Sequence, residues 1–244
     1  MQEGDFVEIE YVGRVKATGE IFDLTSEEVA KKEKIYNPKI RYTPALVIIG
    51  SNMIIKGVMK ELEKMEVGEE RTFDVSPSEG FGLRNPRLIK IIPLSKFTEN
   101  KINPIPGEYF DIDGLQAKVQ SVSGGRVRVD FNHPLAGKVL TYTVKILRKI
   151  EDKKEKIEAL LKYYRIDFSD VVLKEKTVEI KMKKQASGFV KKIVSDLITK
   201  WIKDVERVEF KESEEKRQAH SEARKHNQQV EFKENEEKKG CKAK

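Results

Sequence analysis

Three aromatic side chains and one carboxylate are the residues of this sequence whose types and spacing could form a small site. Tyr11, Phe22 and Tyr142 fall in segments that alternate apolar and polar residues, as strands do. Asp23 follows Phe22 directly. Such a carboxylate either bonds to the hydroxyl groups two and three residues farther on, as in a turn, or anchors a ligand. By spacing alone, the three aromatic residues are more typical of a hydrophobic core.

The elements that must position these side chains are short strands around one helix. The stretches typical of strands are 6–15, 21–23, 43–49, 71–75 and 139–147. Apolar residues recur at helical spacing over 54–65, and Gly68 is expected to end that helix. A capping-box pattern at 25–28 predicts a short helix over 26–33. This order predicts an α+β domain in which a bent antiparallel sheet wraps on one helix.

The segment from Gly50 to Gly82 contains IIKGV, MEVGEER and SPSEGFG in that order. It resembles the central signature of the FKBP-type peptidyl-prolyl isomerases. The resemblance extends to YVG at 11–13, GEIFD at 19–23 and NHPLAGK at 132–138, and so covers most of residues 1–150. It implies the FKBP fold and the cis–trans isomerisation of peptide bonds that precede proline.

An X-Pro bond isomerises slowly because its amide must lose resonance while it twists. A pocket accelerates this step when it holds the twisted amide better than either planar form, which needs aromatic walls, an apolar floor and few polar anchors. The resemblance implies catalytic roles for seven residues: Tyr11, Phe22, Asp23, Ile54, Ile55, Phe81 and Tyr142. It also implies that Val58 and Leu135 border the substrate. No cofactor is expected, nor a metal site, since the three His and one Cys do not cluster.

Two positions differ from the common family pattern. Val58 stands where many members have Trp, and Phe81 stands where a Tyr often donates a hydrogen bond. We therefore expect a shallower pocket that binds macrolide inhibitors weakly, while isomerisation, which rests on shape and exclusion of water, persists. His133 is expected to anchor its loop by a hydrogen bond rather than to act as a catalyst.

Residues 84–131 interrupt the isomerase pattern with an apolar run and a Gly124-Gly125 turn typical of a hairpin. This segment resembles the small β-rich flap domain inserted in SlyD-like FKBPs, which binds unfolded chains. The resemblance implies client contacts for Leu88, Ile89, Ile91 and Ile92. The alternative is that these four residues fill a small β core.

A C-terminal α/β domain is expected over 151–210, with helical stripes at 157–164 and 190–202 and strands at 171–173, 178–182 and 207–210. The long archaeal FKBPs, which the chain resembles over its whole length, carry such a domain. About 60 residues form a marginal core alone, so we expect a homodimer through this domain. The predicted organisation is thus an isomerase domain (1–83 and 132–150), an insert (84–131), the C-terminal domain and a charged, frayed or disordered tail (211–244) with the lone Cys241.

The net charge of +7 is spread along the chain. Residues 1–150 carry 23 Lys+Arg against 21 Asp+Glu, residues 151–210 carry 15 against 12, and residues 211–244 carry 10 against 8. A dedicated nucleic-acid binder concentrates its positive charge, so we do not expect a nucleic-acid partner. The sequence has no apolar run of 18 residues and no signal-peptide pattern, which predicts a cytoplasmic protein without membrane contact.

The sequence and the family resemblance lead to two hypotheses about function. In the first, the chain is a prolyl isomerase of unfolded or nascent polypeptides, and its insert captures the client. In the second, it is an ATP-independent holdase chaperone with a vestigial pocket. A third interpretation, a ribosome-associated factor that uses the mixed-charge tail, rests on composition alone.

Overall fold

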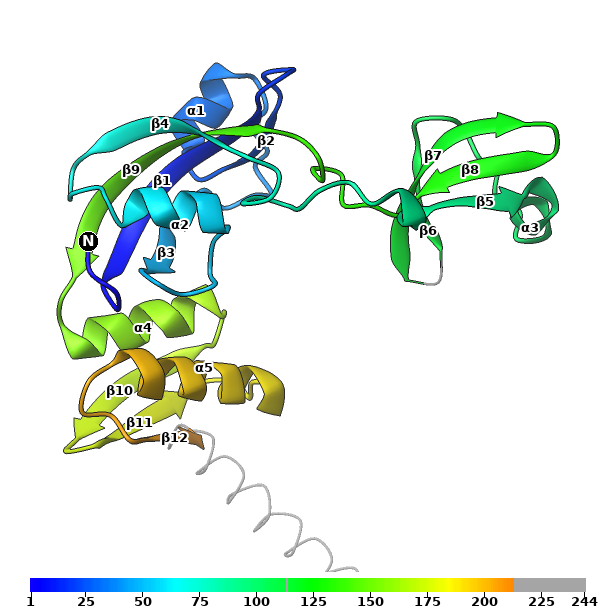
Figure 1. Ribbon diagram of the computed structural model, residues 1–244. Coiled ribbons are helices and arrows are strands. Elements are labelled where there is room, and N and C mark those ends of the chain that lie inside the picture. The colour runs from blue at the N-terminus through cyan, green and yellow to red at the C-terminus, as the bar shows by residue number, and fades with distance from the viewer. Residues whose placement is uncertain (113, 213–244) are drawn as a thin grey trace, which may run out of the picture. The chain divides into compact units, whose positions relative to one another are not determined.

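A computed structural model describes residues 1–112 and 114–212. The chain divides into two compact units, one formed by residues 1–3 and 7–148, and the other by residues 4–6 and the chain from residue 149 on (Figure 1). The predicted tail lies outside the described residues from residue 213 on, and so does Cys241. Among the described helices, none is long and apolar enough to cross a membrane.

The first unit contains a sheet of order β2-β1-β9-β4, with β3 paired to β1. Its strands are β1 (Phe6–Val15), β2 (Ile21–Leu24), β3 (Ala45–Ile48), β4 (Glu70–Val75) and β9 (Leu140–Ile150). Helix α1 (Glu27–Lys32) follows β2, and α2 (Lys56–Leu62) lies under the bend of the sheet in Figure 1. The predicted α+β class, a bent antiparallel sheet around one helix, is confirmed.

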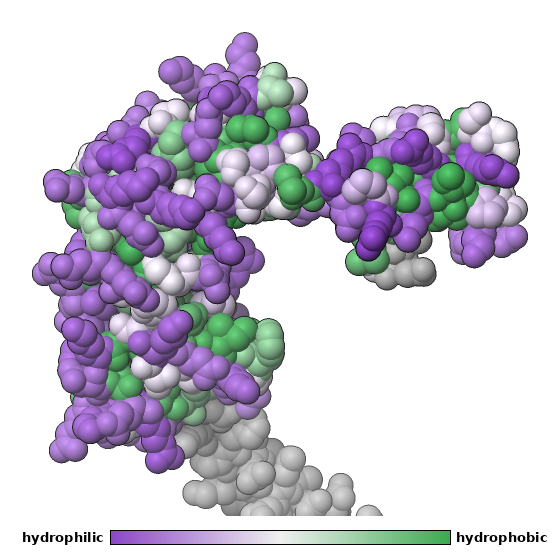
Figure 2. Space-filling view, in the orientation of Figure 1, coloured by the Kyte–Doolittle hydropathy of each residue, from purple (hydrophilic) through white to green (hydrophobic). Residues whose placement is uncertain are grey.

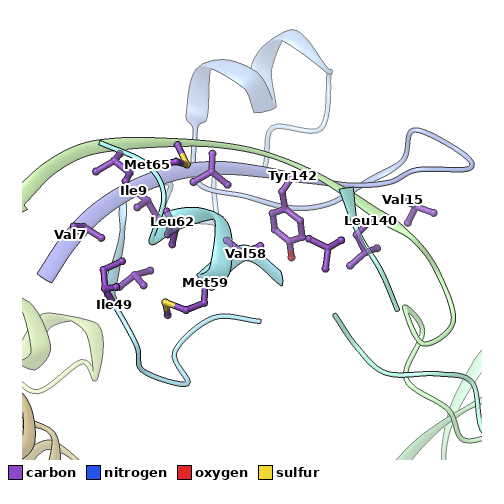
Figure 3. Packing of buried hydrophobic residues seen from close by; sticks show 14 residues of the cluster. Val7, Ile9, Val15, Ile49, Val58, Met59, Leu62, Met65, Leu140 and Tyr142 are labelled. Atoms are coloured by element: carbon purple, nitrogen blue, oxygen red, sulfur yellow. The ribbon is translucent and has the colours of Figure 1, made fainter. Parts of the chain in front are cut away.

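The core of this sheet lies between its strands and α2. Val7, Ile9, Val58 and Leu62 are fully buried there, and Figure 3 shows them in one row with Tyr142. Alternation in β1 places Val7 and Ile9 on this face, as its pattern predicts. A Cβ at Gly57 would lie 2.5 Å from Cγ1 of Val75, so α2 comes this close to β4 only because position 57 has no side chain.

Helix α2 is shorter than its apolar stripe predicts. It ends at Leu62, whereas the expectation placed its end near Gly68. Met65 is still fully buried, in the turn after the helix, which is why the stripe continues past the last helical residue. Gly68 has φ +86° and its N–H donates to the carbonyl of Ile146 at 2.7 Å, so it leads the chain into β4 instead of capping α2.

The predicted capping box before α1 is wrong. Ser26 is the N-cap residue, but its side chain makes no capping hydrogen bond. The hydroxyl of the preceding Thr25 accepts the backbone N–H of Tyr11 at 2.9 Å instead, and the Thr25 N–H donates to the Tyr11 carbonyl at 3.0 Å. The pattern therefore fastens the end of β2 to β1 rather than the start of the helix.

The insert forms a second sheet, of order β5-β8-β7-β6. Its elements are a short 3₁₀ helix (Pro86–Leu88), β5 (Ile89–Pro93), α3 (Leu94–Glu99), β6 (Tyr109–Ile112), β7 (Leu115–Ser123) and β8 (Arg126–Asp130). Its core is separate and small: Phe97, Ala117, Val119, Val127 and Val129. The predicted hairpin is confirmed, with Gly124 at φ +54° and Gly125 at φ +71° joining β7 to β8, as a type I′ turn requires.

The second unit contains a three-stranded sheet of order β10-β11-β12 and two helices. These elements are α4 (Lys153–Tyr163), β10 (Phe168–Lys174), β11 (Thr177–Met182), α5 (Gly188–Trp201) and β12 (Arg207–Glu212). Strand β12 pairs parallel to β11, and α5 is the crossover between them. Val194 and Ile198 are the fully buried residues of α5, on the stripe that predicted the helix.

Candidate active site

Four aromatic rings meet beside the core of the first unit. The ring of Tyr142, on β9, is centred 6.0 Å from that of Tyr11 on β1 and 5.7 Å from that of Phe22 on β2. Phe22 meets Phe81 edge to face at 6.2 Å. Because β1 pairs with β2 and neighbours β9, residues far apart in the sequence converge here. The arrangement is an aromatic wall in which only Tyr142 is fully buried.

The ring of Phe22 lies directly against the backbone of β1. A Cβ at Gly13 would lie 2.6 Å from Cζ of Phe22 and 2.9 Å from Cε2. No side chain larger than hydrogen fits at this position while the ring stays in place. Gly13 is therefore a positioning residue for Phe22, and the YVG sequence on β1 has a steric reason.

Asp23 supplies the carboxylate of this cluster. It is exposed, and its Oδ2 accepts a hydrogen bond from the Tyr11 hydroxyl at 2.7 Å. The bond goes to Tyr11 and not to the hydroxyls of the following turn, which was the alternative left open by the sequence. Burial first, and then the charge of Asp23, raise the pKa of the Tyr142 phenol to about 12. Tyr142 is thus uncharged at physiological pH.

The apolar floor comes from α2 and the loops around it. Val58 is fully buried in the core, while Ile54, Ile55 and Leu135 are half-buried and pack against it. Ile55 has extended backbone at the N-cap of α2. Within the described part of the chain, the N–H of Ile55 has no hydrogen-bond acceptor, so it is available to a bound peptide carbonyl.

His133 anchors its loop as predicted, because its Nδ1 accepts the N–H of Leu135 at 3.2 Å. Its ring also stacks on Phe81, with centroids 4.5 Å apart and planes 2° from parallel. No spacing in the sequence indicates this stack, which extends the aromatic wall. A cavity of about 500 Å³ has His133 in its lining, and none of the seven predicted catalytic residues lines it.

The four candidate residues of the insert are not part of the aromatic cluster. Ile92 packs on the core of the insert and Ile89 is half-buried, as the alternative of a small β core predicts. Leu88 and Ile91 are 41% and 66% exposed. The two exposed residues are therefore the ones available to a client.

Comparison with known proteins identifies the family. A family model described as FKBP-type peptidyl-prolyl cis-trans isomerase matches residues 1–101, and another, described as FKBP26, IF domain, matches residues 90–135. The short-type peptidyl-prolyl cis-trans isomerase of Methanocaldococcus jannaschii is 39% identical over 146 residues, which are 60% of this chain and 92% of that relative. The chain belongs to the FKBP-type peptidyl-prolyl cis-trans isomerases.

Bacterial FKBP-type isomerases are similar as well. The SlyD of Helicobacter pylori is 31% identical over 128 residues, which are 51% of this chain and 69% of that relative. The FKBP-type 16 kDa isomerase of Escherichia coli is 30% identical over 109 residues, 43% of this chain and 72% of that relative. The family, fold class and enzyme class predicted from the sequence are confirmed. The roles of individual residues and the domain boundaries stay predictions.

Proposed function

We propose that this FKBP-type isomerase turns over X-Pro bonds of unfolded or nascent polypeptides at the wall formed by Tyr11, Phe22, Phe81 and Tyr142. The observation that carries the proposal is the convergence of these rings around one carboxylate that is fixed by the Tyr11 hydroxyl. Such a site needs no nucleophile, because no covalent bond is made or broken during the rotation.

The proposed mechanism is differential binding of the twisted amide. The proline ring sits against uncharged aromatic side chains, and Tyr142 stays a phenol because its pKa is about 12. Exclusion of water favours the twisted amide, whose carbonyl and nitrogen are less polarised than in the planar forms. The free N–H of Ile55 holds a neighbouring peptide carbonyl, so the chain is fixed on one side while the other side rotates.

The insert is proposed to hold the client. Leu88, Ile91 and Leu115 are 41%, 66% and 60% exposed, and Ile105 and Tyr109 are also exposed, around a core of five buried residues. Figure 2 shows hydrophobic residues on the visible face of the insert among hydrophilic ones. Apolar side chains left exposed on a small sheet are typical of a protein-binding surface. Capture there raises the local concentration of client prolines at the aromatic wall.

Two variants separate this proposal from the holdase alternative. Replacing residues 84–131 by a short Gly-Ser linker should keep catalysis on a short peptide and sharply reduce catalysis of proline-limited protein folding. A triple variant, Leu88→Ser with Ile91→Ser and Leu115→Ser, should do the same in the intact fold. Val67→Ser, on an exposed surface outside the insert, should not. Little peptide activity in all forms, with aggregation still suppressed, would favour the holdase.

The second unit is proposed to mediate a homodimer. Phe189, at the start of α5, is 75% exposed, and Tyr163 and Leu173 are 45% and 40% exposed. Light scattering should give twice the chain mass for the wild type and a lower mass for Phe189→Glu. The cytoplasmic location expected from the sequence also stays a prediction, which cell fractionation tests.

A further inference from the structure

The segment 31–42, here named the basic bulge, has a local excess of positive charge. The net charge of a longer part of the chain does not show this excess. The bulge reads KKEKIYNPKIRY and holds five Lys or Arg against one Glu, an excess of four. The whole of residues 1–150 has an excess of only two. Residues 181–192 of the second unit have a larger excess, five Lys and no acid, but two of these cations are paired, Lys181 with Asp170 and Lys184 with Asp167.

The cations of the basic bulge are largely uncompensated. Lys31 pairs with Glu27 at 2.6 Å, and the one acid of the bulge, Glu33, is taken by Arg14 at 2.8 Å. Four exposed cations remain that form no ion pair with any described residue: Lys32, Lys34, Lys39 and Arg41. In Figure 2, hydrophilic side chains cover the region of α1, where the bulge begins.

Apolar and aromatic side chains lie among these cations. Ile35, Tyr36 and Ile40 are 47%, 42% and 54% exposed. Tyr36 stacks on Tyr42, with ring centroids 5.6 Å apart, and the Tyr42 hydroxyl accepts the N–H of Asn37 at 3.0 Å. The loop is therefore pre-organised. It exposes apolar side chains to water, and these side chains are not part of the core of the fold.

The basic bulge follows β2, the strand that carries Phe22 and Asp23 of the proposed catalytic wall. Seven residues separate Asp23 from Lys31, and Thr25 is bonded on both its N–H and its hydroxyl to the backbone of Tyr11. The ion pair of Arg14 with Glu33 joins the same strand β1 to the bulge. These links hold the start of the bulge to β1 and β2, the two strands that carry Tyr11 and Asp23.

From this juxtaposition we propose that the basic bulge is an auxiliary substrate surface that selects client segments carrying several acidic residues, interspersed with apolar ones, beside the X-Pro bond. The inference rests on the proposed function and names the substrate class that this site prefers. Four unpaired cations give the charge complementarity, and Ile35, Tyr36 and Ile40 give apolar contacts to the same segment. An acidic polypeptide fits better than RNA because two of the three exposed large side chains are isoleucines, which do not stack on bases.

The test uses the full chain and pairs of 12-residue peptides with one central Ala-Pro bond. One peptide of each pair carries four Asp or Glu residues with two Leu on one side of the proline, and its partner carries Asn or Gln at those four positions. Both the N-terminal and the C-terminal side are tried, with exchange rates measured by NMR. The test variant removes the four unpaired cations: Lys32→Gln, Lys34→Gln, Lys39→Gln and Arg41→Gln. The control variant removes four exposed cations of the second unit: Lys162→Gln, Lys183→Gln, Lys192→Gln and Lys203→Gln.

We expect kcat/KM for the acidic peptide to exceed that of its neutral partner about fivefold in 50 mM salt, from several weak surface pairs acting together. In 1 M salt, where the screening length is about 3 Å, the ratio should fall toward one. The test variant should bring it near one even in low salt, and the control variant should keep it.

Other outcomes would overturn the inference. A ratio near one for the wild type on both sides of the proline does so, as does a ratio that the test variant leaves unchanged. Labelled 12-nucleotide single-stranded RNA that loses affinity in the test variant, without any acidic-peptide preference, would assign the surface to nucleic acid instead. If no peptide is isomerised, the proposed function itself fails, and fluorescence anisotropy of the same peptides then decides whether the bulge binds acidic segments.

Discussion

Adding one methyl group at Gly13 should disable the site without touching any predicted catalytic residue. The new Cβ of Gly13→Ala would lie 2.6 Å from Cζ of Phe22, whereas ordinary contact begins at 3.4 Å. The ring must therefore retreat from residue 13 by about 0.8 Å, which changes its packing against Phe81 and Tyr142. The backbone at residue 13 is not in the left-handed region, so alanine itself is tolerated there.

The cost of this displacement can be estimated in two ways. Overpacking of a close-packed group destabilises by about 1–3 kcal/mol. Misplacement of a substrate-positioning group by about 1 Å lowers rates by up to about 100-fold. Since Phe22 is a wall and not a reacting group, we expect kcat/KM on a short X-Pro peptide to fall about tenfold or more, with the loss of stability readable as a lower urea midpoint.

Two companion variants isolate the steric cause. Gly188→Ala adds the same methyl group where nothing lies within 4 Å, and should leave the rate unchanged. In the background of Phe22→Leu, whose smaller side chain leaves room for the new Cβ, Gly13→Ala should cost little further activity. A Gly13→Ala enzyme with wild-type activity and a native fold would refute the reasoning, because it would show that the position of Phe22 does not matter.

Two further predictions concern titrating groups. Folding raises the pKa of Tyr142 to about 12 from the ordinary value of 10. The contribution of Tyr142 to the free energy of unfolding is therefore complete below pH 10 and is lost as pH rises toward 12. Tyr142→Phe should lack this loss in urea titrations between pH 9 and 11.5. Burial opposes ionisation of Asp130, but the N–H groups of Asn132 and the charge of Arg84 outweigh burial and lower the pKa of this carboxyl below 3.8. The contribution of Asp130 to the free energy of unfolding is therefore lost as pH falls through the lowered pKa. Asp130→Ala should destabilise the insert by about 1–3 kcal/mol at pH 7, measured by hydrogen exchange of the insert amides.

Much of the fold could be predicted because local pattern and tertiary environment agree. The alternation of β1, the Gly-Gly hairpin of the insert and the apolar stripe of α5 each appear as expected. The end of α2 could not be predicted from periodicity, since Met65 is buried by a turn and not by the helix. The predicted capping box is wrong because the Thr25 hydroxyl accepts the N–H of Tyr11, 14 residues away. No local sequence pattern indicates such a long-range hydrogen bond.

The residues of the candidate site could be predicted only from the family resemblance. Spacing alone favoured core positions for Tyr11, Phe22 and Tyr142, and Tyr142 is indeed both buried and part of the aromatic wall. The stack of His133 on Phe81 joins two loops, and the spacing of these residues in the sequence does not predict it. Averaging charge over 150 residues conceals the basic bulge, whereas a window of 12 residues shows it together with the Lys-rich segment 181–192.

The most direct test of the account is the cis-to-trans rate of a short X-Pro peptide, measured with the wild type and with a variant that combines Phe22→Ala and Asp23→Ala. We predict clear acceleration by the wild type and a loss of most of it in the variant, whose fold should be retained by circular dichroism. Equal acceleration by both proteins would show that the aromatic wall is not where isomerisation occurs.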